Sequence, residues 1–452
     1  MRKFIARHIA YPLQDRFNNT SILQTHLWLK ESQFWPESQM IEYQFTKFKK
    51  LFEYARRNVP YYEDLFSSIK LKPADIKSFD DLYKIPVLTK EIARKESHNL
   101  IARNLPKKHI QQGITGGTTG PPLRLLRDSG DLTYTWAAFF RWYNWMGIDI
   151  GDRVSKIWGT RTVLSLPLKQ RLINEIKNWY YNRSVINSFG LREETIPFAI
   201  QKLNNFEPKL IRGYLSAFIQ IAEYLRDNNL KLAFRPLAVS STTETLLDPY
   251  RQLIEEQFGA KIYDQYGCGE CNSIAFEAGD GLGLYVASEH VKLEILDESG
   301  SAETKKDGRF IITNLDNYAM PFIRYENGDV GQFHDTSKKK FNLPLLKRVS
   351  GRTADTIALA NGSKVHGVFF TDILNELFGT DPMNINRFQV FQKEAGAIEF
   401  RIESKKQLSA ESKTILDKAL YRFFNRVDIV IMDSLPHDKS GKFRYILTEK
   451  SE

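Results

Sequence analysis

Apolar residues recur at three- and four-residue spacing in four segments of the chain, which is the pattern of a helix with one buried face. The pattern predicts helices over residues 44–57, 193–205, 215–228 and 247–258. Short apolar or β-rich runs at 237–240 and 261–265 each lead into a polar or glycine-bearing turn, as strands do when their carboxyl ends carry ligand loops. Runs at 291–296 and 310–315 enclose the polar segment 297–307 and predict a β-hairpin.

The pattern changes after Arg352. Strands are predicted over 387–392, 397–402 and 427–432, and an amphipathic helix over 410–426. These elements would form a compact α+β unit of about a hundred residues. We therefore predict an α/β protein with a large multi-layer mixed domain over 1–350, a hinge over 351–355 and a small mobile α+β domain over 356–452. Gly351 favours the hinge, because glycine permits the large changes in φ and ψ that a domain rotation needs.

Length and composition agree with two domains, since 452 residues with 42% hydrophobic content can bury more than one core. No run approaches the roughly 18 consecutive apolar residues of a membrane span, and no signal peptide follows Met1, so we expect a cytoplasmic protein. The net charge of +10 would suit nucleic acid or an anionic membrane. However, Lys and Arg are dispersed among 54 acidic residues without a zinc finger or a long basic tail, and we expect no nucleic-acid partner.

Two helical segments leave alternatives open. Residues 1–17 interleave basic and apolar side chains, which fits either a peripheral helix on a bilayer or a helix packed on its own domain. The aromatic segment 134–145 predicts packing inside the protein, and Arg141 within it is a candidate contact for an anionic acyl group.

The two cysteines, Cys268 and Cys271, form a C-x-x-C pair. A zinc site needs about four ligands, and the eight histidines show no spacing that supplies the others. A disulfide or redox centre has no further support. We expect these two small side chains to pack beside a nucleotide loop.

The loop from Ile114 to Pro122, with the sequence ITGGTTGPP, is the most informative segment. Glycine lets the backbone approach a polyphosphate, and threonine adds hydroxyl donors. The Gly-Lys-Ser/Thr ending of a Walker A motif is missing, which argues against an ordinary P-loop NTPase. The same residues before two prolines also make an ordinary surface turn, and the loop alone does not decide between the two.

Four further segments follow this loop in a fixed order. They are Y-G-C-G-E at 266–270, Y-E-N-G-D at 325–329, G-R-T-A-D at 351–355 and S-G-K at 440–442. Together with the loop they resemble the ordered motifs of the AMP-forming acyl-adenylate ligases, the superfamily of acyl-CoA synthetases, luciferase and the adenylation domains of peptide synthetases. Segments 58–62, 240–244 and 320–325 are most similar to its phenylacetate-CoA ligase-like group. The start of the chain and Arg212–Tyr214 are more similar to the CapK-like branch of capsular polysaccharide biosynthesis.

This resemblance implies the acyl-adenylate ligase fold and a set of nucleotide contacts. Loop residues would surround the β- and γ-phosphates of ATP, namely Thr115, Gly116, Gly117, Thr118, Thr119 and Gly120, with Thr118 among the catalytic residues. Tyr266 would offer an aromatic face to adenine beside Gly267, and Ser241, Thr242 and Glu244 would form the opposite edge of the base pocket. Asp329 would accept hydrogen bonds from the ribose hydroxyls, and Arg352 would contact ribose or phosphate.

Two further residues would act on the transferring phosphoryl group. The Glu270 carboxylate would hold Mg²⁺ through oxygen, as this hard cation prefers. Lys442 would bridge the substrate carboxylate and the α-phosphate oxygens, because a lysine is a flexible point charge. The resemblance therefore implies catalysis by Lys442, Glu270 and Thr118, with ATP and Mg²⁺ as cofactors.

The acyl acceptor stays open. The phenylacetate-CoA ligase-like resemblance implies CoA, whereas the CapK-like branch favours an amine or hydroxyl of a sugar in surface-polysaccharide assembly. Pro121, Gly269 and Ala354 depart from the superfamily motifs, which also leaves a non-catalytic nucleotide-binding scaffold as an alternative. The chain retains four motif residues, namely Glu270, Asp329, Arg352 and Lys442, and this argues for catalysis. We expect an AMP-forming ligase that activates a small carboxylic acid.

Overall fold

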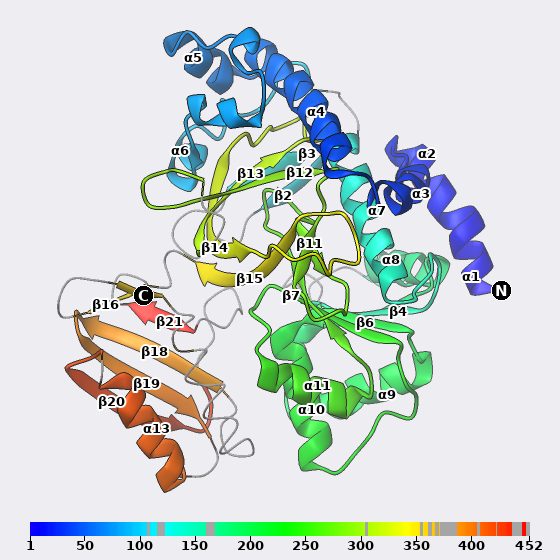
Figure 1. Cartoon of the computed structure of the whole chain (residues 1–452). Helices are drawn as coiled ribbons and strands as arrows, with labels where there is room; N and C mark the ends of the chain where they lie inside the picture. Colours follow the sequence, from blue (N-terminus) through cyan, green and yellow to red (C-terminus); the bar gives the residue numbers. More distant parts are fainter. Residues whose placement is uncertain are drawn as a thin grey trace.

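The computed structural model describes residues 1–105, 109–114, 123–159, 168–302, 306–352, 356–359, 364–366, 370, 387–404, 407–421, 423–435 and 445–448. Figure 1 shows a large N-terminal part built from helices and sheets, and a smaller C-terminal part beside it. The α/β class predicted from the sequence is confirmed. None of the described helices is long and apolar enough to cross a membrane.

Helices dominate the first hundred residues. They are α1 (Arg2–Ile5), the π-helical turn η1 (Ala6–Ala10), α2 (Tyr11–Asn18), α3 (Ile22–Ser32), α4 (Glu37–Asn58), α5 (Pro60–Ser68), the 3-10 turns η2 (Pro73–Asp75) and η3 (Phe79–Lys84), and α6 (Lys90–Lys95). The predicted helix 44–57 lies within α4 and is confirmed. Helix α4 ends at Asn58 because Val59 precedes a proline and is extended, and Pro60 then begins α5. The segment 1–17 packs partly on its own domain, through buried Ala6, Ala10 and Tyr11.

A parallel five-stranded sheet forms the middle of the chain, in the order β5-β4-β6-β7-β8. Its strands are β4 (Val154–Ile157), β5 (Arg183–Ile186), β6 (Leu210–Tyr214), β7 (Ala238–Thr242) and β8 (Ile262–Tyr263). Helices α9 (Ile196–Phe206), α10 (Leu215–Asp227) and α11 (Asp248–Phe258) pack in the apolar cluster of one face, and α7 (Ser129–Trp145) packs in that of the other. The helix α8 (Leu168–Tyr180) precedes β5. The three helices predicted between residues 193 and 258 are confirmed.

A mixed eight-stranded sheet follows, in the order β12-β13-β14-β15-β11-β10-β9, with β1 paired to β14. Its strands are β1 (Leu88–Thr89), β9 (Gln265–Tyr266), β10 (Ala275–Glu277), β11 (Leu284–Val286), β12 (Val291–Leu296), β13 (Gly308–Asn314), β14 (Tyr325–Phe333) and β15 (Leu345–Arg352). The predicted hairpin is confirmed as the antiparallel pair β12–β13. The predicted strand 261–265 is instead divided at Asp264, whose carboxylate accepts the Gln265 N–H, so that β8 and β9 belong to different sheets.

The C-terminal part is an α+β unit, as predicted. Its four-stranded sheet has the order β20-β19-β18-β21, with β18 (Arg387–Glu394), β19 (Ala397–Glu403), β20 (Arg426–Met432), β21 (Ile446–Thr448) and the helix α13 (Ala410–Leu420), beside the pair β16 (Thr356–Ala358) and β17 (Lys364–His366). The predicted helix 410–426 was too long. The N–H groups of Asn425 and Arg426 donate to the Gly396 carbonyl, which joins the chain to the β18–β19 turn and starts β20.

The predicted hinge begins inside a strand. Gly351 and Arg352 are the last residues of β15, where they pair with Val330 and Asp329 of β14. Residues 353–355 lie outside the described part of the chain. A rotation of the small unit would therefore have to start after Arg352.

Candidate active site

The ends of the predicted phosphate loop are held by a short hairpin. Strand β2 (Gln111–Ile114) pairs antiparallel with β3 (Arg124–Arg127), and Ile114 faces Arg124 in the register. Loop residues Thr115 to Gly120 themselves lie outside the described residues. Nη2 of Arg127 donates a hydrogen bond of 2.5 Å to the Gly269 carbonyl oxygen. The base of the hairpin therefore lies against the residue that precedes Glu270.

Glu270 is a buried carboxylate between β9 and β10, with 6% of its surface exposed. The Tyr325 hydroxyl donates to its Oε1 atom at 2.6 Å. Burial and the adjacent Glu270 charge raise the pKa of Tyr325, so the phenol stays protonated and acts as the donor. Among the described residues no Lys, Arg or His forms an ion pair with Glu270. A buried carboxylate without a basic partner calls for a cation from outside the chain.

The donor set around Glu270 fits Mg²⁺ held together with a nucleotide. Only one of its oxygens accepts the Tyr325 hydroxyl, and the described part of the chain holds no group of three His, Cys, Asp or Glu side chains that could form a closed metal cage. Mg²⁺ in proteins commonly uses one or two carboxylates, with phosphate oxygens and water completing six ligands. Glu270 is therefore suited to be the ligand that the protein supplies to such a site.

Asp329 is a second carboxylate, fixed by its neighbours on the same sheet. Its Oδ2 atom accepts hydrogen bonds from the Tyr266 hydroxyl at 2.7 Å and from Nδ2 of Asn327 at 2.6 Å. Its own N–H donates to Oδ1 of Asn327. Gly328, between these two residues, has a φ of +85°, a conformation that glycine adopts without strain. The spacing of the Y-E-N-G-D segment therefore builds one turn that presents the Asp329 carboxylate.

Tyr266 is mostly buried and does not present a freely exposed ring to an adenine base. Only 8% of its surface is exposed, and its ring packs edge-on against Phe310 with centroids 5.5 Å apart. Burial and the charge of Asp329 hold the pKa of the Tyr266 hydroxyl well above its usual range, so that it remains a donor to Asp329. Gly267 is tightly enclosed, because a Cβ there would approach the Ser273 nitrogen to 3.1 Å. Tyr266 thus positions Asp329, and its contact with adenine stays a prediction.

The predicted opposite edge of the base pocket lies at the end of β7. Ser241 is buried and donates to Oδ1 of Asp264 at 3.2 Å. Burial and the nearby Glu277 raise the pKa of Asp264 to about 7. The Glu244 carboxylate accepts the N–H and the hydroxyl of Ser216 at 3.0 and 2.9 Å, in the first turn of α10. Glu244 therefore fixes the loop after β7 to a helix N-terminus, where a negative charge is favourable.

Several predicted residues are not brought into this site by the described structure. Thr118 and Lys442 lie outside the described residues, and Arg352 is described only through its backbone pairing with Asp329. The expectation that Arg141 is a candidate contact for an anionic acyl group is wrong. Its Nη1 lies 2.6 Å from Oε1 of Glu289, and both side chains are 1% exposed, so its charge is already paired inside the protein.

The cysteine pair forms a tight turn next to Glu270. The Cys268 N–H donates to the Cys271 carbonyl at 2.9 Å, and both thiols are free. Burial raises the pKa of both thiols, which makes them unreactive small side chains. Cys271 and partly buried Cys268 contribute to the apolar cluster under β9 and β10.

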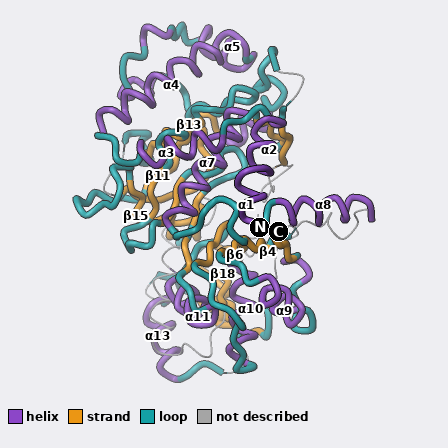
Figure 2. Tube along the Cα trace, turned by 90° about the vertical axis from the view of Figure 1, so that its right-hand side faces the viewer, coloured by secondary structure: helices purple, strands orange, loops and turns teal. Residues whose placement is uncertain are grey.

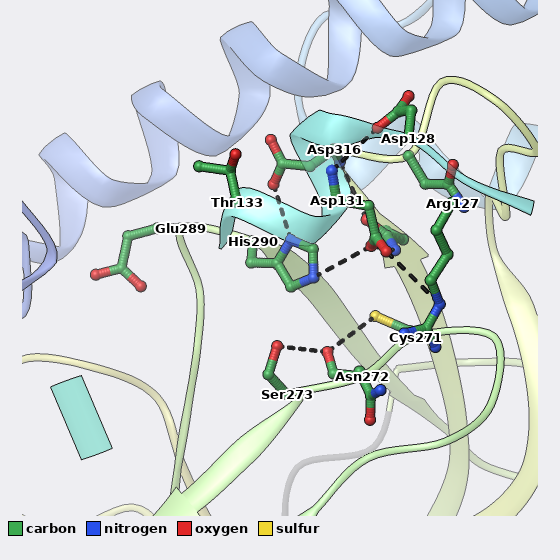
Figure 3. Close-up of polar contacts among 12 residues, drawn as sticks. Arg127, Asp128, Asp131, Thr133, Cys271, Asn272, Ser273, Glu289, His290 and Asp316 are labelled. Atoms are coloured by element: carbon green, nitrogen blue, oxygen red, sulfur yellow. Dashed lines mark hydrogen bonds and ion pairs between the residues drawn. The ribbon is translucent and has the colours of Figure 1, made fainter. Parts of the chain in front are cut away.

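A buried polar network supports this turn, and no sequence motif indicated it. In Figure 3, His290 lies between Asp131 and Asp316, and Arg127 approaches Asp131 from the side of Cys271. His290 Nδ1 is 2.8 Å from Asp316, and Arg127 Nε is 3.7 Å from Asp131. Asp316 also pairs with Lys47 of α4 at 2.7 Å. The network joins segments that are far apart in the chain, which is why residue spacing could not reveal it.

The fold and this site together define a class of protein. A parallel sheet and a mixed sheet bring two fixed carboxylates, Glu270 and Asp329, beside the hairpin that carries a glycine-threonine loop, and a small α+β unit follows. This is the architecture expected of an AMP-forming acyl-adenylate ligase.

Comparison with known proteins shows which ones this chain resembles. Residues 357–449 match the family model of the CapK C-terminal domain. The chain is 26% identical to Protein CapK of Staphylococcus aureus over 328 residues, which are 70% of this chain and 69% of CapK. It is 24% identical to a phenylacetate-coenzyme A ligase of Aromatoleum evansii over 332 residues, 70% of this chain and 71% of that ligase. The chain is therefore similar to CapK and to the phenylacetate-coenzyme A ligases over about 70% of its length.

The solved structures agree on the fold. A 2-hydroxyisobutyryl-CoA ligase in the postadenylation state, in complex with R3-HIB-AMP, superposes with a TM-score of 0.75 over 92% of this chain and 93% of that chain, at 16% identity. The same ligase in the thioesterification state gives a TM-score of 0.61. Both comparisons support the same fold.

Proposed function

We propose that this ligase activates a carboxylic acid with ATP to an acyl-adenylate and transfers the acyl group to CoA. The observation that carries the proposal is Glu270. Its buried carboxylate is oriented by Tyr325 at 2.6 Å and tied to the phosphate-loop hairpin through Arg127, without a basic partner among the described residues. A cation carried in with a polyphosphate would supply the missing positive charge.

The first step forms a bond between a carboxylate oxygen and the α-phosphorus, while the bond to the pyrophosphate oxygen breaks in line with it. Mg²⁺ would neutralise charge on the phosphates, and Glu270 would hold it. Asp329, fixed by Tyr266 and Asn327, would accept the ribose hydroxyls and so set the direction of the α-phosphate. Thr118 and its loop neighbours would surround the leaving pyrophosphate, and Lys442 would balance the charge on the attacking and transferring oxygens.

The relatives support CoA as acceptor. One is named a phenylacetate-coenzyme A ligase, and the solved 2-hydroxyisobutyryl-CoA ligase was also captured in complex with 2-HIB-AMP and CoA. In the second step a CoA thiolate would attack the acyl carbonyl, and AMP would leave with the electrons of the broken anhydride bond. A rotation starting after Arg352 would exchange the face that the small unit presents to the site.

A sugar amine or hydroxyl is the second candidate acceptor. The match of residues 357–449 to the CapK C-terminal domain and the 26% identity to CapK favour it, because the C-terminal unit is the part that would face the acceptor. With this acceptor the enzyme would acylate a building block of a surface polysaccharide.

ATP–pyrophosphate exchange with purified protein tests adenylation across aryl, fatty, hydroxy and amino acids. We expect exchange with one class of acid, lost about a hundredfold or more in Lys442→Ala, and retained in Lys413→Ala, which removes an exposed lysine of α13. Mass spectrometry of the product with CoA or with amino sugars then identifies the acceptor. Absence of exchange with every acid, in protein that binds ATP, would refute the proposal.

A further inference from the structure

Three basic side chains share one face of the parallel sheet. Lys156 on β4 is paired with Arg212 on β6, and Val154, two residues before Lys156, is paired with Arg183 on β5. Paired residues of neighbouring strands, and residues two apart on one strand, point to the same face. That face packs against α7, since Val154 shares an apolar cluster with its aromatic side chains. We call Lys156, Arg183 and Arg212 the basic triad.

Aromatic rings surround the basic triad. The Arg212 guanidinium lies 4.0 Å from the ring centre of Phe139, and the Lys156 ammonium lies 5.4 Å from that of Trp136. Arg183 lies 4.9 Å from the ring of Tyr181. Such cation–π contacts stabilise each charge, but they do not neutralise it.

Within the described part of the chain, no carboxylate balances these charges. Among the described residues none of the three forms an ion pair within 4.0 Å, and their hydrogen bonds go to neutral groups. Arg212 donates to the Tyr143 hydroxyl at 3.1 Å and to Oε1 of Gln265 at 3.0 Å, and Arg183 donates to the Tyr11 hydroxyl. Like charges enclosed by aromatic rings repel one another and lose part of the stabilisation of water.

Unused hydrogen-bonding groups remain in the same place. Nε of Arg212, which is 7% exposed, and Oγ of fully buried Ser240, its register partner on β7, have no hydrogen-bond partner in the described structure. The Lys156 ammonium donates no hydrogen bond to any described residue. Burial, and then repulsion by Arg183 and Arg212, hold the pKa of Lys156 well below its usual range. An anion bound here would favour the protonated form of Lys156. It would also accept hydrogen bonds from the unused donors.

The basic triad adjoins the candidate active site. Gln265, which accepts from Arg212, is the residue before Tyr266, and Ser240 precedes Ser241 at the end of β7. Lys156, Trp136 and Trp158 are each partly exposed, so the cluster is open to solvent on that side. A small molecule that reaches from the nucleotide site along β6 would meet Arg212 first.

We propose that the basic triad binds a second negatively charged group, a carboxylate or a phosphate, on the acid that this enzyme activates. The acid would place its reacting carboxylate at the α-phosphate and its second anionic group against Lys156 and Arg212. This inference rests on the proposed adenylation for its use of the acid, but binding of the anion itself does not require ATP.

The test compares matched acids by calorimetry without nucleotide, and then by ATP–pyrophosphate exchange. Glutarate is compared with valerate, phthalate with benzoate, and 3-phosphoglycerate with glycerate, so that each pair differs in the second charge. We expect at least one dianion to bind tenfold or more tightly than its partner. Lys156→Met and Arg212→Met should each remove this difference, and Lys261→Met, an exposed lysine before β8, should not. If the dicarboxylates show the larger difference, the second anionic group is a carboxylate; if 3-phosphoglycerate shows it, the group is a phosphate.

The outcomes separate this inference from the proposed function. Exchange that favours monoanions and is unchanged in Lys156→Met would overturn the inference and leave adenylation intact. Dianion binding that needs Lys156, with no exchange for any acid, would support the inference and refute adenylation. If Lys156→Met unfolds, Lys156→Gln serves as the second variant, and binding as tight as in the wild type would again overturn the inference.

A second, independent observation concerns the outside of the molecule. Every side chain described from 169 to 180 of α8 is exposed or partly exposed, including apolar Leu172, Ile176 and Trp179. A helix of 13 residues without a buried face is marginal in water, and its apolar stripe calls for a partner. Figure 2 shows α8 extending away from the rest of the molecule.

The N-terminal segment extends this surface. Phe4 and Phe17 are 63% and 71% exposed, and the Arg2 guanidinium lies 5.4 Å from the ring centre of Trp179. Residues 1–17 and 168–180 together hold seven basic and two acidic side chains. Apolar and aromatic groups rimmed by positive charge match the interface of an anionic bilayer.

We infer that α8 and residues 1–17 dock on an anionic lipid surface. Sedimentation with vesicles of phosphatidylcholine alone, or mixed with phosphatidylglycerol, tests this. We expect binding only to the mixed vesicles, weakened tenfold or more in Leu172→Ser/Trp179→Ser and unchanged in Phe198→Ser, which alters an apolar side chain exposed elsewhere. Equal binding by the double variant, or a concentration-dependent dimer that the double variant abolishes without any vesicle binding, would overturn the inference.

Discussion

The hydrogen bond from Tyr325 to Glu270 offers the sharpest test of the proposed magnesium site. Tyr325→Phe removes only the hydroxyl that orients the buried carboxylate at 2.6 Å. A residue that orients a metal-binding side chain typically changes metal affinity by about 10- to 100-fold. We therefore expect Tyr325→Phe to need about 10- to 100-fold more Mg²⁺ for half-maximal ATP–pyrophosphate exchange, with a smaller change in the rate at saturating Mg²⁺.

The matched control is Tyr62→Phe. Tyr62 is also buried, but its hydroxyl donates to the Pro321 carbonyl and accepts the Ile323 N–H, away from Glu270. Tyr325→Phe should lower the free energy of unfolding by about 0.5–1.5 kcal/mol, the usual net worth of one hydrogen bond, and Tyr62→Phe by about twice as much, because its hydroxyl makes two. Only Tyr325→Phe should change the Mg²⁺ requirement. A wild-type Mg²⁺ curve for Tyr325→Phe, or an equal shift in both variants, would refute the reasoning.

Three other predictions concern residues at or near the site. Glu289→Gln leaves the Arg141 charge buried and unpaired, so urea denaturation should show a loss of about 3–5 kcal/mol. Gly328→Ala places a side chain at a φ of +85°, which should cost about 1–2 kcal/mol and raise the KM for ATP by displacing Asp329. Because the pKa of Lys156 is lowered on folding, the unfolded chain binds more protons between that pKa and 10.5, and stability should rise with pH through this window. Lys156→Met should flatten this slope, measured as the urea midpoint between pH 7 and 10.

The sequence could predict elements whose signal is local. Periodicity located α9, α10 and α11, because each buries one face of a regular helix. Periodicity predicted α13 to be longer than it is, because the apolar residues after Leu420 continue a helical pattern. In the structure, hydrogen bonds to the Gly396 carbonyl begin a strand there instead. Periodicity did not predict α8, whose apolar stripe has no buried partner in the described structure.

The candidate site was likewise predictable only in part from the sequence. Motif order indicated Glu270 and Asp329, but not the groups that orient them. Tyr325 lies 55 residues from Glu270 in the chain, and Arg127 lies 142 residues from Gly269. Such contacts depend on how sheets and hairpins pack, which the spacing of residues within one segment does not encode. The basic triad was hidden for the same reason, since its members come from three separate strands.

Strand β14 accounts for the rigidity of the site on which the proposed adenylation depends. Its first residue, Tyr325, orients Glu270, and its fifth, Asp329, is the second carboxylate. The strand is paired on both sides, with β13 and β15, so the two carboxylates are fixed to one body. Arg352 ends β15 opposite Asp329, and the small unit follows it. A rotation after Arg352 would therefore move the small unit, with the proposed Lys442, while the nucleotide contacts of the large part stay in place, which is what a two-step ligase with one nucleotide site needs.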